Sequence, residues 1–154
     1  MPREVHGWLA ALVVLGLAAC GNSLTPRDRL VDSVTVFCDA LRWQQYDQAS
    51  NYLPERERKT YLDVHDRLSE LIDVTDLEVV RRTMGPKDTA TVLIALSWIA
   101  KNDPVVRKTF LEQRWELKGE TWSMVRERHV RGTRLPGSLR HPTSAPASQP
   151  AEGG

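Results

Sequence analysis

The residues of this chain that could do chemistry are few, and two of them stand close together. Tyr61 and His65 are four residues apart in a segment with helical spacing, so they share the apolar face of one helical turn. Histidine and tyrosine serve as general acids and bases when burial tunes their pKa. The alternative is a half-buried histidine and tyrosine that only close a hydrophobic core.

Other catalytic and ligand-binding patterns are absent from the sequence. There is no nucleophile elbow, phosphate-binding loop, dinucleotide-binding glycine motif, zinc-protease motif or paired-cysteine motif. Beyond the leader, His65, His129 and His141 have spacings that match no zinc site. We therefore expect no metal and no cofactor. The net charge of +1 also argues against a nucleic-acid partner, which would need a concentrated basic surface.

Cys20 lies in the most specific motif of the chain. An apolar run from Trp8 to Ala19 precedes it, about the length of a signal-peptide core and too short to span a membrane. The string Leu17-Ala18-Ala19-Cys20 is similar to a bacterial lipobox. The resemblance implies a signal peptide over residues 1–19 and lipid attachment through Cys20. An ordinary secretory leader with a cysteine at its cleavage site is the alternative.

The lipobox also implies a location and a membrane partner. Two or three acyl chains on Cys20 would anchor the protein effectively permanently. Gly21, rather than aspartate, favours the outer over the inner membrane of the envelope, with the domain facing the periplasm. A tether of residues 20–24 reaches at most about 15 Å beyond the cysteine, so the domain would sit close to the membrane.

Helical patterns occupy the first half of the remaining chain. Thr25, Pro26 and Asp28 form a helix start, followed by an apolar face that includes Cys38 and runs to about Trp43. Asp47 could cap a short second helix. A third helix starts at Pro54, with Tyr61, His65, Leu68 and Ile72 on its apolar face.

Strand patterns follow Asp76. We expect strands at 77–84, 89–100, 105–117 and 120–129, the second of them apolar on both faces. A two-residue loop at Lys118-Gly119 would place Trp115 opposite Trp122. The sequence thus predicts one α+β domain over residues 25–131, with helices on one face of a curved antiparallel sheet of about four strands. Residues 132–154, rich in Pro, Ser, Ala and Gly, should be a disordered tail.

The pattern resembles the cystatin-like superfamily of nuclear transport factor 2 and ketosteroid isomerase. The resemblance rests on Phe37–Leu53 (FCDALRWQQYDQASNYL) and Thr109–Val125 (TFLEQRWELKGETWSMV). It implies a cone-shaped pocket between helices and sheet, where active relatives place an Asp or His with a Tyr. The candidate lining here is Tyr61, His65, Trp98, Gln113, Trp115 and Trp122. No Asp or Glu is placed on the inner strand face, because Glu112 and Glu116 alternate outward, and this argues against isomerase or dehydratase chemistry.

Three functions therefore remain open. The first is a non-catalytic, lipid-anchored module that binds an envelope protein or a small apolar ligand. The second is an enzyme using His65 and Tyr61, and the third is a structural subunit of an envelope assembly. A homodimer through the sheet, or cover of that face within a monomer, would account for the second strand's two apolar faces.

Two further features have competing interpretations. Cys38 is either a buried thiol or, with Cys20 acylated, half of an intermolecular disulfide. The C-terminal stretch is locally basic and is either a solvated strand end or a surface attracted to anionic lipid; its basic residues are Arg126, Arg128, Arg131, Arg134 and Arg140.

Overall fold

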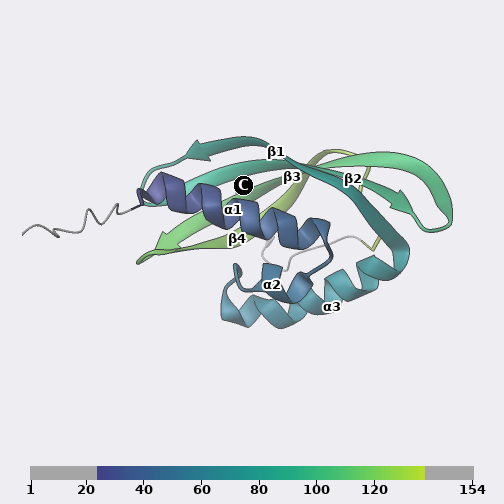
Figure 1. Ribbon diagram of the computed structural model, residues 1–154, viewed down its shortest axis with the longest axis horizontal. Helices are drawn as coiled ribbons and strands as arrows, with labels where there is room; N and C mark the ends of the chain where they lie inside the picture. Colours follow the sequence, from purple (N-terminus) through teal and green to yellow (C-terminus); the bar gives the residue numbers. More distant parts are fainter. Residues whose placement is uncertain (1–23, 138–154) are drawn as a thin grey trace, which may run out of the picture.

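The computed structural model describes residues 24–137, which form three helices followed by a four-stranded antiparallel sheet (Figure 1). The strands lie in the sheet in chain order, β1-β2-β3-β4. This confirms the predicted α+β class. The expected signal peptide, Cys20 and residues 138–154 of the expected tail lie outside the described residues.

Helix α1, Pro26–Arg42, begins with the capping box that the sequence predicts. The Thr25 hydroxyl accepts a hydrogen bond from the Asp28 amide, and the Asp28 carboxylate accepts one from the Thr25 amide, each at 3.2 Å. These bonds satisfy donors that a helix start otherwise leaves without partners. The pKa of Asp28 is lowered, most by the Thr25 hydroxyl, which lies 2.6 Å from the Asp28 carboxylate, and then by the bond from the Thr25 amide.

The next two helices differ from expectation at their ends. Helix α2, Tyr46–Ser50, begins one residue before Asp47, which lies in its first turn and is not the cap. Helix α3, Glu55–Leu71, stops before Ile72. Ile72 was expected on the helix, but it is the first residue of β1 and is buried there. A β-branched side chain packs well on a pleated sheet, and here this tertiary contact overrides the helical spacing.

Four strands follow, and each is at least as long as the sequence predicts. Strand β2, Thr89–Ala100, matches it at both ends. The others extend beyond the expected bounds, because pairing with a neighbouring strand continues past the local pattern; they are β1 Ile72–Met84, β3 Asp103–Lys118 and β4 Thr121–Gly132.

The β3–β4 hairpin corrects the predicted register. Its two-residue loop is Gly119-Glu120, and Gly119 has a φ of +62° at the first loop position, as a hairpin turn of this length can require. Lys118 therefore pairs with Thr121, and Trp115 lies opposite Met124, not Trp122. The predicted Trp–Trp pair does not form because glycine takes the first loop position and not the second.

The helices pack on one face of the sheet, as Figure 1 shows, and α1 contacts both edge strands, β1 and β4. The sheet therefore curves around α1. Phe37 of α1 meets the Trp115 ring edge-on at 5.5 Å between centroids, and Trp115 is fully buried. The alternation predicted for β3 is confirmed, with Thr109, Leu111, Gln113 and Trp115 facing this core.

The ordered domain continues past the predicted boundary at residue 131. Gly132, at a φ of +82°, turns the chain back onto the sheet. The Thr133 amide then donates to the Lys108 carbonyl at 2.9 Å, and Leu135 is buried in the core. We call residues 133–137 the closing segment. This part of the expected tail is packed, because the buried Leu135 and the hydrogen bonds that Thr133 makes with Lys108 and Thr109 outweigh its polar composition.

Candidate functional site

The space between the concave face of the sheet and the helices, which we call the cone, is filled largely by the protein's own side chains. Phe37 and Tyr61 enter from the helices, and Gln113, Trp115 and Trp122 enter from the sheet. Each of these five side chains is at most 2% exposed. Large aromatic side chains thus occupy the volume in which a ligand would otherwise sit.

A carboxylate enters the cone from β4. Gln113 of β3 lies opposite Glu127, and its side-chain amide donates to the Glu127 carboxylate at 2.7 Å. The amide oxygen of Gln113 accepts from the Trp115 indole at 3.2 Å. The two hydrogen bonds that link Trp115, Gln113 and Glu127 therefore fix the position of one acidic group on the inner face of the sheet.

Tyr61 and His65 lie one turn apart on the buried face of α3, and their rings are in contact. The ring centroids of Tyr61 and His65 are 3.8 Å apart. The ring of Tyr46 packs against His65 as well, with 5.0 Å between their centroids. His65 Nδ1 is 2.9 Å from the Tyr61 carbonyl oxygen, which can only accept, so Nδ1 carries a proton. Burial raises the pKa of Tyr61 well above its ordinary value, and the negative charge of Glu127 raises it further.

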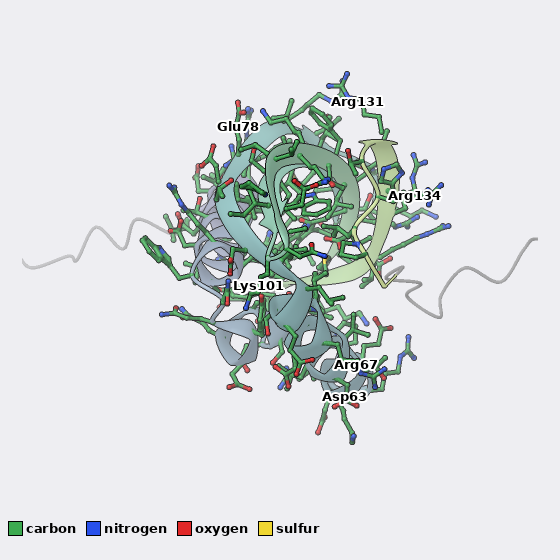
Figure 2. The ribbon with its side chains drawn as sticks, turned by 90° about the vertical axis from the view of Figure 1, so that its right-hand side faces the viewer. Asp63, Arg67, Glu78, Lys101, Arg131 and Arg134 are labelled. Carbon is green, nitrogen blue, oxygen red and sulfur yellow. The ribbon has the colours of Figure 1, made fainter. Side chains whose placement is uncertain are left out.

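A small pocket lies at the edge of the cone, beneath the closing segment. Its volume is about 90 Å³, and it is lined by Thr109, Leu111, Glu127, His129 and Leu135, with Arg128 and Arg134 beside them. Figure 2 labels Arg131, near the end of β4, and Arg134, which follows the strand. Ligand pockets for drug-sized molecules typically span ~300–1,000 Å³, so this one is small.

The six predicted pocket residues are divided among several places, and none of them lines this pocket. Gln113 and Trp115 form the hydrogen bonds that hold Glu127 in place. The Trp98 indole donates to the Thr109 hydroxyl at 2.8 Å, behind the pocket wall. The Trp122 indole donates to the Pro26 carbonyl at 2.9 Å, at the opposite end of the core from the closing segment.

Glu127 is the site residue that sequence reasoning missed. Trp122 and Met124 face the core, and simple alternation would send residue 127 outward. Val125 and Val130 of β4 have no paired residue on β3, so each forms a β-bulge. The bulge at Val125 shifts the alternation by one residue and places Glu127 and His129 on the inner face. The inner face therefore does hold an acid, which corrects the expectation that none could be placed there. Glu112 and Glu116 do lie on the other face.

Comparison with solved structures identifies the fold. A protein from Cytophaga hutchinsonii described as NTF2-like superposes with a TM-score of 0.54 at 12% identity, over 69% of this chain and 98% of that one.

The chain has an NTF2-like fold.

A protein from Catenulispora acidiphila with a ketosteroid isomerase-like fold, solved with trimethylamine, gives a TM-score of 0.52 at 12% identity, over 63% of this chain and 84% of that one. At such identity the likeness defines the NTF2-like fold alone. No protein-family model and no curated protein sequence matches the chain.

Two further observations concern the described part of the NTF2-like domain. Residues 24–137 contain no group of three or more His, Cys, Asp or Glu side chains placed to hold a metal ion. None of their helices is long and apolar enough to cross a bilayer.

Proposed function

We propose that this protein is a lipid-anchored module of the bacterial cell envelope that acts by binding and not by catalysis. The observation that favours this proposal over catalysis in the cone is that the cone is filled: Trp115, Tyr61 and Gln113 are at most 2% exposed, and the adjoining pocket is about 90 Å³. A substrate the size of a steroid would not fit without displacing core side chains. Recognition would then occur on the outside of the domain.

The anchor rests on the lipobox-like string that ends at Cys20. We expect cells grown with an alkyne-bearing fatty acid to label the full chain, and Cys20→Ala to abolish the label. Cys38→Ala is the matched control, because the second thiol is buried and should leave labelling unchanged. Equal labelling of Cys20→Ala and the parent chain would contradict the anchor.

The filled cone is tested by native mass spectrometry of residues 21–154, which contain every helix, strand and core residue of the described domain. We expect a mass equal to that of the chain alone after gentle purification from cells. A stoichiometric small-molecule adduct would contradict a filled cone.

An enzyme remains the second candidate, and Glu127 is the observation that favours it. Its carboxylate is held by Gln113 on the inner face, near the Tyr61 and His65 pair. A carboxylate in such surroundings could serve as a general base. An adduct in the mass spectrum that disappears in Glu127→Gln would support this second function over the first.

The homodimer stays a prediction. Among the described residues, two arginines of β4 cover part of the outer face of the sheet. The Arg131 guanidinium lies 3.9 Å from the centre of the Phe110 ring, and Arg128 forms an ion pair with Glu112 at 2.6 Å. The same native mass spectrum would report one or two copies.

A further inference from the structure

An open groove of about 800 Å³ is lined by the start of α3 and by residues of β3 and β4. Its charged lining consists of Arg56, Arg114, Lys118 and Arg126 against Glu55 and Glu116. Pro54 and Val125 add apolar surface to the lining. The groove is therefore basic, with a net excess of two positive charges from the four bases and two acids.

The strand register concentrates this charge. Arg114 and Arg126 pair directly across β3 and β4, an arrangement of like charges that destabilises a sheet unless something neutralises it. Arg114 contacts Glu116 at 3.4 Å. No residue of the described range 24–137 forms an ion pair with Arg126 or Lys118. Two positive charges of the groove thus remain available to an external anion.

The groove belongs to the half of the molecule where the chain enters the domain. Lys118 immediately precedes the β3–β4 loop, and Glu120 in that loop contacts Arg29 of α1 at 3.1 Å. Trp122, just after the loop, bonds to Pro26 at the start of α1. In Figure 1 the start of α1 and the β3–β4 loop lie at the same end of the molecule. Only residues 21–24 separate α1 and its cap from Cys20.

We propose that this groove binds the phosphate groups of anionic lipids in the membrane that carries the protein. The inference deepens the proposed function and rests on it, because the short tether is what would hold the groove at a lipid surface. A guanidinium group matches phosphate with two parallel hydrogen bonds, and Arg114 and Arg126 present two such groups side by side. Val125 and Pro54 in the same lining would contact the glycerol or upper acyl region.

The test uses residues 21–154, without the acyl chains, so that its result does not depend on the anchor. Co-sedimentation with vesicles of phosphatidylcholine containing about 30% phosphatidylglycerol should show binding, and pure phosphatidylcholine should show almost none. Each basic residue at an anionic surface changes the partition about fivefold, so Arg114→Gln with Arg126→Gln should weaken binding by about 25-fold. Circular dichroism would verify that both proteins are folded.

A matched control removes the same charge elsewhere. Arg81 and Arg82 are exposed on β1, the opposite edge strand, so Arg81→Gln with Arg82→Gln should weaken vesicle binding less than threefold. An equal loss in both double variants would overturn the groove, since only overall charge would then matter. Titration with inorganic phosphate separates a free-anion site from a lipid surface: phosphate binding without vesicle binding would also overturn the proposal. Fatty-acid labelling at Cys20 is scored separately, so failure of the anchor and failure of the groove are distinguishable.

Discussion

At the scale of single residues, two glycines have the same backbone constraint but different surroundings. Gly119 and Gly132 both have positive φ, +62° and +82°. A β-carbon on Gly119 would meet nothing within 4 Å, whereas one on Gly132 would lie 2.2 Å from the Lys108 carbonyl oxygen. Gly132 is therefore required both for its conformation and for the close approach of the closing segment to β3.

This difference predicts unequal costs for the two alanine substitutions. Gly119→Ala should lower the free energy of unfolding by about 1–2 kcal/mol, the cost of a left-handed backbone for a residue with a side chain. Gly132→Ala should cost at least twice as much, since the backbone of Lys108 must also move. Urea unfolding monitored by tryptophan fluorescence would measure both. Equal losses would mean that the closing segment is not held against β3.

Cys38 predicts a pH dependence. Burial raises the pKa of its thiol from 9.0 to about 12. Between these values the unfolded chain releases the proton and the folded chain keeps it, so stability falls as pH rises above 9 and is fully present below it. The loss approaches about 1.4 kcal/mol per pH unit in that range.

Comparison with Cys38→Ala isolates this contribution from other titrating groups. The parent chain should lose stability more steeply than the variant between pH 9 and pH 11 in urea titrations. Iodoacetamide should modify Cys38 slowly in the native protein and rapidly in guanidinium. A band of twice the monomer mass on non-reducing electrophoresis, absent in Cys38→Ala, would instead support the intermolecular disulfide.

At the scale of elements, the beginning of β3 is an edge that its own side chains cover. Strand β4 pairs with β3 from Thr109 onward, and Thr133 bonds to Lys108, so within the described part of the chain residues 103–107 have no strand partner on that side. The Val105 amide donates to Asp103, its carbonyl accepts from Arg107 at 2.9 Å, and Asp103 and Arg107 form an ion pair. Side chains thus satisfy the backbone amide and carbonyl of Val105, which the ladder with β2 leaves unpaired at its register shift.

Removing this cover should promote association. Asp103→Ala with Arg107→Ala would expose the edge beside Val105 and Val106, which are already 58% and 65% exposed. We expect sedimentation velocity to show larger species whose fraction grows with concentration. Lys101→Ala, a surface change in the adjacent turn, should sediment like the parent chain. If the double variant behaves like this control, the side chains do not protect the edge.

At the scale of the whole molecule, the closing segment completes the core. Leu135 is 9% exposed and belongs to the same apolar cluster as residues of every strand. The Thr109 hydroxyl joins this segment to the sheet, accepting from Trp98 and donating to the Thr133 carbonyl. The domain is therefore closed by residues that follow its last strand.

Leu135→Ala should lower the free energy of unfolding by about 2–3 kcal/mol, since truncation of a buried leucine leaves a cavity. Arg134→Ala, beside it and exposed, should change stability by less than about 0.5 kcal/mol. Urea unfolding compares the two. Similar small effects would mean that the segment lies on the core without contributing to it.

Local signals in the sequence determined the order and type of the elements. The Thr25 and Asp28 capping box starts α1, and an uninterrupted apolar run between turn residues defines β2. These features depend on residues within one turn of helix or one strand, so the pattern along the chain is sufficient. The shared helix face of Tyr61 and His65 was predictable for the same reason, although the contact between their rings was not.

Tertiary structure alone decided which groups meet inside the cone. The extra residue Val125 reverses the alternation of β4, and only pairing with β3 places Glu127 beside Gln113. Likewise, Leu135 is a single apolar residue in a polar stretch, with no period to mark it as buried. Its burial depends on contacts with strands far away in the sequence, and no local pattern records a contact of that kind.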